Sequence, residues 1–226
     1  LNIDLLPAKV EQMGGIKYVI SVLMLIGFGV KAGMVPLHAW LPQAYAAAPS
    51  SASAILSGIL SKTGVFGILM VSSIIMKGDI YISTVLVVLG FMTMLTGGLM
   101  AVLQKPLKRI LAYSSMSQVG YIITGIGLIG LLGEHGAIAV YGTILFLINH
   151  TLFKGMLFLC SGIINRSTHE QNINLLKGFG RHRQLLKLAF FIGMIGITGM
   201  PGFVGFAGKT LLHEALGETR HLYHSS

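Results

Sequence analysis

Three stretches of this chain run for more than 20 residues without a charged side chain, at 82–103, 110–132 and 188–208. About 20 consecutive apolar residues are enough for a helix to cross the hydrocarbon core of a bilayer. Only helices and closed barrels satisfy the backbone in lipid, and long runs without alternating polarity favour helices. The sequence therefore predicts an all-α integral membrane protein.

Three further spans are predicted near residues 16–35, 52–76 and 137–164, where single polar residues interrupt apolar runs. The expected architecture is about six transmembrane helices in a single transmembrane domain covering residues 1–226. Charged residues make up 10% of the chain, against roughly 25% in soluble domains. The chain begins with Leu rather than Met, and we expect a fragment that lacks upstream helices.

The charged residues are distributed unevenly between the two ends of these spans. Loops 104–109 and 165–187 fall on one side if every span crosses once, and together they hold eight Lys or Arg and one acid. Because loops rich in Lys and Arg stay in the cytoplasm, both loops are predicted to be cytoplasmic. The protein itself is predicted to lie in the inner membrane of a prokaryotic cell. The net charge of +9 thus reflects topology, and no nucleic-acid partner is expected.

Two prolines, Pro36 and Pro201, lie inside predicted spans. Proline removes a backbone donor and clashes with the preceding turn, so two broken helices are expected. Lys31 lies five residues before the first break, and Lys209 lies eight residues after the second. Broken helices in matching positions are typical of inverted-repeat transporters, whose ion path runs at mid-membrane.

Four lysines, namely Lys31, Lys62, Lys154 and Lys209, lie within the predicted spans. A lysine at the centre of a membrane helix costs about 2.5 to 3.5 kcal/mol, unless its stem snorkels to the interface. Burial away from water favours the neutral amine form of a lysine, whereas a nearby acid favours the charged ammonium form. Lysines that lie close together also influence one another, so they titrate as a coupled set. The lysines are therefore predicted to form a proton relay that needs no catalytic residue, cofactor or metal in this chain.

His150 and Lys154 are four residues apart and share one helix face. A neutral imidazole can accept and donate a hydrogen bond at once, which suits proton transfer, although a structural histidine is the alternative. Five other polar residues are candidates for lining the channel: His38, Ser57, Ser61, Ser117 and Gln118. For the serines and Gln118 the alternative is a contact between packed helices. For His38 the alternative is anchoring at the membrane interface beside Trp40.

Four segments in this order, at 31–69, 107–121, 145–162 and 200–209, closely resemble a family of antiporter-like membrane subunits. The family is shared by respiratory complex I, Mrp-type sodium/proton antiporters and energy-converting membrane-bound hydrogenases. The resemblance implies a fold of two inverted repeats, of which this chain would cover the end of the first and most of the second. It also implies translocation of protons, or of protons linked to sodium, within a multi-subunit membrane complex.

The resemblance assigns family roles to the residues of the predicted relay. Lys62 resembles the central lysine that connects two half-channels, while His150 and Lys154 match the residues of the linking helix. Lys209 matches the residue on the second broken helix, which is lysine or glutamate in the family. Lys31 matches the lysine on the first broken helix, whose glutamate partner lies two helices earlier and has no counterpart here.

The predicted function is therefore proton translocation by a subunit of a redox-driven complex of the hydrogenase or NADH-quinone oxidoreductase type. The redox chemistry would occur on partner subunits, because one cysteine is too few to hold an iron–sulfur cluster. The ending GKTLLHEALGE is nearer to the hydrogenase-linked members. The alternatives are a subunit of an Mrp-type antiporter without a redox partner, a stand-alone antiporter and a structural membrane scaffold.

Overall fold

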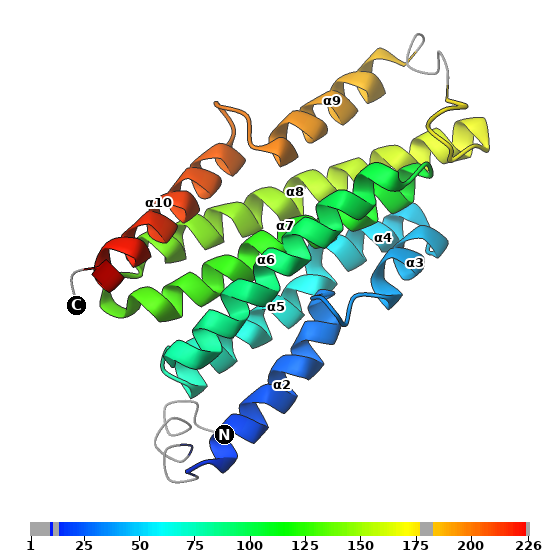
Figure 1. Cartoon of the computed structure of the whole chain (residues 1–226). Helices are drawn as coiled ribbons and strands as arrows, with labels where there is room; N and C mark the ends of the chain where they lie inside the picture. Colours follow the sequence, from blue (N-terminus) through cyan, green and yellow to red (C-terminus); the bar gives the residue numbers. More distant parts are fainter. Residues whose placement is uncertain (1–9, 11–13, 177–182, 225–226) are drawn as a thin grey trace.

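The computed structural model describes residues 10, 14–176 and 183–224, apart from the side chains of 134 and 220–224. Within these ranges the chain is built from helices joined by short connections, and it forms no strand there (Figure 1). The all-α prediction is confirmed to this extent.

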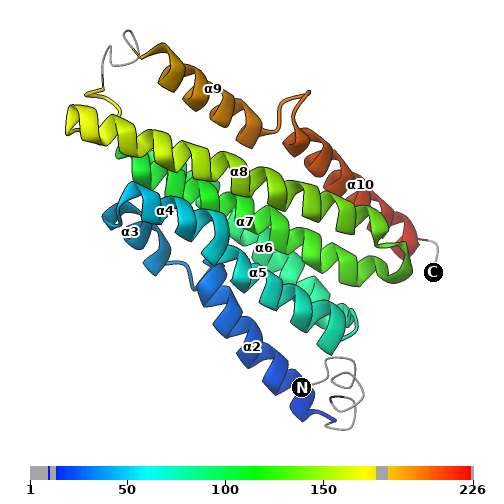
Figure 2. The same cartoon turned by 180° about the vertical axis from the view of Figure 1, so that it is seen from behind.

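Four helices of the described chain are long and apolar enough to cross a bilayer. The first, Ser50–Ile75, is continuous but changes its winding through α4 (Ser50–Ile55), the π-helical turn η2 (Leu56–Leu60), α5 (Ser61–Leu69) and the π-helical η3 (Met70–Ile75). The other three are α6 (Ile80–Leu103), α7 (Leu107–Leu132) and α8 (Ala137–Thr168). They lie side by side with alternating directions in both views (Figure 1, Figure 2).

The other two predicted spans are each divided by a turn. Helix α2 (Ile16–Ala32) is followed by α3 (Trp40–Ala47), and α9 (Gln184–Thr198) is followed by α10 (Val204–His224). Both first halves end at a left-handed glycine, Gly33 with φ 78° and Gly199 with φ 75°. Glycine is favoured at such a helix end, and a proline soon afterwards cannot continue the helix. Pro36 and Pro201 lie within these two turns.

Helix α7 lies at the centre of the bundle, between α6 and α8. It approaches α6 closely, since a Cβ atom on Gly120 would lie 2.4 Å from the backbone nitrogen of Met94. Small residues of this kind allow helices in lipid to pack backbone against backbone. Most of α7 is therefore enclosed, and its polar side chains meet those of neighbouring helices rather than lipid.

The described parts of the two loops predicted to be cytoplasmic lie together at one end of the bundle. The backbone N–H of Leu107 donates to the carbonyl of Gln171 at 2.8 Å, and that of Ile173 donates to Lys105 at 3.1 Å. Lys108 Nζ donates to the carbonyl of Ala48 at 2.8 Å, so the end of α3 lies at this end too. Residues 177–182 of the second loop lie outside the described residues.

Candidate functional site

Lys62 is the second residue of α5, two positions after the end of the π-helical turn η2, and it hydrogen-bonds to that turn. Its Nζ atom donates to the carbonyl oxygen of Ser57, and the hydroxyl of Ser61 donates to the same oxygen at 3.2 Å. The side chain also lines a groove toward α8, opposite Leu147 and Thr151. A π turn within an α-helix is rare and is frequently found at functional sites. The widened turn thus provides the carbonyl that positions the Lys62 ammonium.

Lys154 on α8 is completely buried, with 0% of its surface exposed. Its Nζ atom donates to the carbonyl oxygen of Leu111 at 3.0 Å and to the hydroxyl of Ser114, both on α7. The side chain therefore points into the bundle and joins two helices, rather than extending along the surface as a snorkelling lysine would.

The two lysines are connected by a line of polar contacts across three helices. The hydroxyl oxygens of Ser57 and Ser115 are 3.0 Å apart, so one donates to the other. The Ser115 hydroxyl also lies 2.9 Å from the Leu111 carbonyl that accepts from Lys154. Lys62 and Lys154 thus lie at the two ends of this line of contacts.

His150 lies one helical turn before Lys154 and is completely buried. Thr151, the next residue of α8, lines the same groove as Lys62. Neither ring nitrogen hydrogen-bonds to another residue in the described part of the chain. The imidazole thus lies on the helix of Lys154 and close to the groove of Lys62, without being held there by a hydrogen bond to a described residue.

Lys209 lies on α10, beside the second helix break. Its Nζ atom donates to the carbonyl of Thr198, the last residue of α9, at 2.8 Å. The same atom is 5.2 Å from the centroid of the Tyr121 ring on α7 and 6.0 Å from that of Phe146 on α8. A cation is favoured both at the C-terminus of a helix and over an aromatic face. The break therefore supplies a binding position for Lys209 against the central helices.

Lys31 is placed differently from the other members of the predicted relay. It occupies the last turn of α2, and its side chain is exposed. The polar groups of the adjacent break are bound elsewhere: Trp40 Nε1 donates to the Val30 carbonyl at 2.8 Å, and the Val35 N–H donates to Thr93 Oγ1 at 3.0 Å. The structure therefore brings Lys62, His150 and Lys154 together but leaves Lys31 outside that cluster.

Some of the predicted channel-lining residues contact the cluster of Lys62, His150 and Lys154, and others lie elsewhere. Ser57 and Ser61 contact the cluster directly, as described above. Ser117 donates to the Met94 carbonyl of α6 at 2.9 Å and so takes part in the α6–α7 contact. His38 and Gln118 are half-buried, and one polar atom of each is buried without a hydrogen-bond partner among the described residues.

Two polar residues at the site did not emerge from the sequence. One is Ser115, which connects Ser57 to α7. The other is Asn149, which is 2% exposed and donates through Nδ2 to the Gly196 carbonyl of α9 at 3.0 Å. A Cβ atom on Gly205 would lie 2.6 Å from that same Nδ2, so Asn149 contacts both halves of the second broken helix. A signal was present for Asn149, which is polar and directly precedes His150, and for Ser115, which lies two residues before Ser117 in a serine-rich segment.

Comparison with known proteins identifies a family over almost the whole chain. Residues 6–223 match the family described as NADH:quinone oxidoreductase/Mrp antiporter, transmembrane. Formate hydrogenlyase subunit 3 of Escherichia coli (strain K12) is 33% identical over 220 residues, which are 95% of this chain and 36% of that protein. A Na(+)/H(+) antiporter subunit of Alkalihalophilus pseudofirmus is 34% identical over 198 residues, 86% of this chain and 39% of that protein.

The fold matches solved membrane complexes as well. The Mrp complex from Dietzia sp. DQ12-45-1b superposes with a TM-score of 0.84 and 31% identity, over 92% of this chain and 38% of the matched chain. An archaeal respiratory complex, the membrane-bound sulfane sulfur reductase, gives a TM-score of 0.74 and 26% identity, over 86% of this chain and 39% of the other. The chain thus spans little more than a third of the length of these relatives. It belongs to the transmembrane subunit family shared by NADH:quinone oxidoreductases and Mrp antiporters.

Proposed function

We propose that this chain translocates protons across a membrane through Lys62, His150, Lys154 and Lys209. The observation that carries this proposal is the cluster of two lysines and a buried histidine joined across three helices. Ionisable groups inside a membrane protein are costly and typically mark an ion path. A scaffold would not need them at the centre of its bundle.

Protons would move along this cluster over groups that can both accept and donate. The carbonyl oxygens of Ser57 and Leu111 only accept, so their role is to position the two ammonium groups. Transfer would use the hydroxyls of Ser57 and Ser115, the imidazole of His150 and water. Because two ammonium groups repel strongly at low dielectric, arrival of a proton at one lysine would promote release from the other.

Lys209 would connect this cluster to the far side of the membrane through the second break. Its ammonium is bound at the end of α9 and contacts ring faces of α7 and α8, the helices that carry Ser115 and His150. Lys31 would act as a proton-transfer group beside the first break, at the end of α2. The acidic partner that the family resemblance gives to Lys31 would belong to another part of the full protein.

We further propose six membrane crossings, with α2–α3 and α9–α10 each forming one interrupted crossing of an inverted repeat. The two pairs are supported by the same local chemistry, since each break has a left-handed glycine followed within three residues by proline. The basic end of the bundle, which includes the 104–109 loop, would face the cytoplasm of a prokaryotic cell.

The proposed setting is a redox-driven complex in which partner subunits carry out electron transfer. The relatives from formate hydrogenlyase and from hydrogenase-4, the latter 35% identical over 189 residues, support this choice. The second candidate is an Mrp-type antiporter without a redox partner, supported by the Na(+)/H(+) antiporter relative and the Mrp complex. Mass spectrometry of the purified complex decides between them, because only the first predicts hydrogenase or quinone-reductase subunits.

Substitution of Lys62 in the complete complex, reconstituted in vesicles, tests the relay. Lys62→Ala should reduce proton pumping by about tenfold or more, as expected when a proton-transfer group is lost. Lys62→Arg should be nearly as harmful, since a guanidinium does not release its proton at accessible pH. Normal pumping by a fully assembled Lys62→Ala complex would refute the proposed role.

A further inference from the structure

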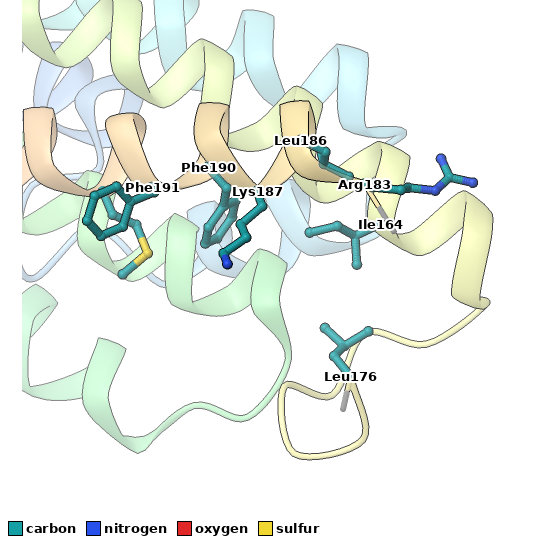
Figure 3. Close-up of a pocket in the computed structure, with 8 residues that line it drawn as sticks. Ile164, Leu176, Arg183, Leu186, Lys187, Phe190 and Phe191 are labelled. Carbon is teal, nitrogen blue, oxygen red and sulfur yellow. The ribbon is translucent and has the colours of Figure 1, made fainter. Parts of the chain in front are cut away.

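Tyr45 of α3 is almost completely buried, and the relay described above does not include it. Its ring packs against that of Phe158 on α8, with the ring centroids 5.8 Å apart and an angle of 81° between the ring planes. The apolar cluster around it extends across α7 to Phe190 on α9, which also lines the cavity drawn in Figure 3. The ring therefore fixes α3 against the centre of the bundle, and the hydroxyl at its tip reaches a neighbouring helix.

The Tyr45 hydroxyl donates to the carbonyl oxygen of Leu56 at 3.1 Å. Leu56 is the first residue of the π-helical turn η2, and its carbonyl also accepts from the backbone N–H of Ser61, five residues later. A hydrogen bond over five residues defines a π turn, whereas in an α-helix the Ser61 N–H would donate to Ser57. Tyr45 thus binds the carbonyl group on which the π winding of this turn depends.

The π winding decides which groups the next carbonyl, that of Ser57, can bind. Because the Ser61 N–H is directed to Leu56, the Ser57 carbonyl accepts from the side chains of Lys62 and Ser61 instead. With α winding, the Ser61 N–H would compete for this same oxygen. The position of the Lys62 ammonium therefore depends on a turn whose first carbonyl is bound by Tyr45.

Other contacts hold the end of α3 in place independently of the π turn. The backbone carbonyl of Tyr45 accepts from the hydroxyl of Ser53 at 2.8 Å, and that of Ala48 accepts from Lys108 Nζ at 2.8 Å. These donors satisfy carbonyl groups that the end of a helix leaves open. They bind α3 to α4 and α7, so loss of the Tyr45 hydroxyl would release the turn without releasing α3.

We propose that Tyr45 is a positioning residue for Lys62, because its hydroxyl holds the turn Leu56–Leu60 in the π winding. Helix α3 is the second half of the first broken helix, so this contact also connects that break to Lys62. The inference rests on the proposed role of Lys62 in proton translocation. Its structural part, the hold of Tyr45 on the turn, is measured separately from transport.

Removal of the Tyr45 hydroxyl alone tests the proposal in the complete complex, reconstituted in vesicles. Tyr45→Phe keeps the ring against Phe158 and deletes one hydrogen bond, so the backbone amides of residues 56–62 should exchange hydrogen about fivefold faster. Proton pumping should fall severalfold, because Lys62 loses its fixed acceptor. Incorporation of 4-aminophenylalanine in place of Tyr45 returns an N–H donor to the same position and should recover most of both properties.

Ser53→Ala is the matched control, since it removes a buried hydrogen bond to α3 and leaves the Leu56 contact in place. Pumping and the exchange of residues 56–62 should stay unchanged in this variant. In a Lys62→Ala background, Tyr45→Phe should not lower pumping further, because the two substitutions act through one group and are not additive. If Tyr45→Phe does not assemble, the 4-aminophenylalanine variant takes its place. Its N–H is a weaker donor than a phenol, so exchange should still be faster than with tyrosine.

Three results would overturn the proposal. Unchanged exchange of residues 56–62 in the assembled Tyr45 variant, measured by mass spectrometry, would show that the hydroxyl does not hold the turn. An equal loss of pumping in Ser53→Ala would show that only the docking of α3 matters. A further loss of pumping in the Lys62→Ala background would show that Tyr45 acts on another group. A failure of the relay itself is distinguishable, because Lys62→Ala would then pump normally while exchange still reported on Tyr45 and the turn.

Discussion

A buried ammonium usually has a negative partner, but Lys154 is held by a carbonyl and a hydroxyl. These two partners suit both protonation states of the side chain. The ammonium donates to Leu111 and Ser114, whereas a neutral amine can accept from the Ser114 hydroxyl and still donate to the carbonyl. A carboxylate at the same position would favour the charged state and hold the proton. The proposed relay thus depends on neutral partners around Lys154.

At the level of single residues, we predict opposite outcomes for two serines on α7. Ser115→Ala removes the hydroxyl that contacts Ser57 and should slow proton pumping severalfold. Ser117→Ala removes a hydroxyl that binds Met94 on α6 and should leave pumping unchanged. Each should cost about 0.6 kcal/mol of stability, the usual magnitude for a hydrogen bond between membrane helices. Pumping assays and unfolding titrations on both variants make the comparison, and equal pumping rates would contradict the role of Ser115.

At the level of elements, the two broken helices differ in the side chain that hydrogen-bonds to the carbonyl groups at the break. Each first half ends with carbonyl groups that the helix itself cannot satisfy. At the first break the Val30 carbonyl accepts from the neutral indole of Trp40, and at the second the Thr198 carbonyl accepts from the titratable Lys209. The second break therefore joins Lys209, a member of the proposed relay, to the end of a helix, and Asn149 connects that break to α8.

Removal of the Asn149 side chain should loosen the second break. Asn149→Ala deletes the hydrogen bond to Gly196, which is worth about 1 kcal/mol, so backbone amides near Gly199 and Gly205 should exchange hydrogen about fivefold faster. Pumping should fall as well, because Lys209 would lose its fixed position. Thr151→Ala is the control, since among the described residues the Thr151 hydroxyl donates to Leu147 of its own helix. Unchanged exchange in Asn149→Ala, measured by mass spectrometry, would show that this contact does not hold the break.

The sequence predicted the helical class and the places of the two breaks, because apolar run length and proline act locally. The detailed geometry of the site could not be predicted from the sequence. The π turn at Leu56–Leu60 has no simple sequence signature, and it changes which side chains of this helix share a face with Lys62. The sequence also does not tell which neighbouring helix each serine of α7 faces, so Ser117 was predicted, whereas Ser115, which contacts Ser57, was missed. The exposed position of Lys31 depends on how α2 packs, which the spacing to Pro36 does not determine.

At the level of the whole molecule, the described bundle matches only part of the length of its relatives. Helices α2 and α9 carry many exposed apolar side chains, and Lys31 is exposed beside its break. The relatives are more than twice as long as this chain and include subunits of multi-subunit membrane complexes. These surfaces would therefore face lipid, further helices of the full protein or other subunits.

The proposed orientation can be measured with single cysteines in a cysteine-free background. Lys105→Cys, at the basic end, should react with a membrane-impermeant thiol reagent only from the cytoplasmic side. His135→Cys lies in the turn between α7 and α8 at the opposite end, and it should react only from the other side. Labelling of right-side-out and inverted vesicles makes the comparison. The reverse pattern would invert the topology, and reaction of both from one side would rule out a crossing by α7.

The π turn at Leu56–Leu60 also constrains how this helix can change in evolution. Each residue of an α-helix advances the side chains by about 100° around the axis, and a π turn holds roughly one residue more than an α turn. Deletion of a single residue here would leave a helix that still crosses the membrane and stays apolar. Because the deleted residue is the extra one that the π turn holds, the segment would become an α turn and Lys62 would keep its side of the helix. What would be lost is the widened turn whose Ser57 carbonyl binds the Lys62 ammonium. Such a protein would keep the lysine and the apolar helix while changing how the lysine is held, so it would separate the presence of the proposed proton site from its positioning.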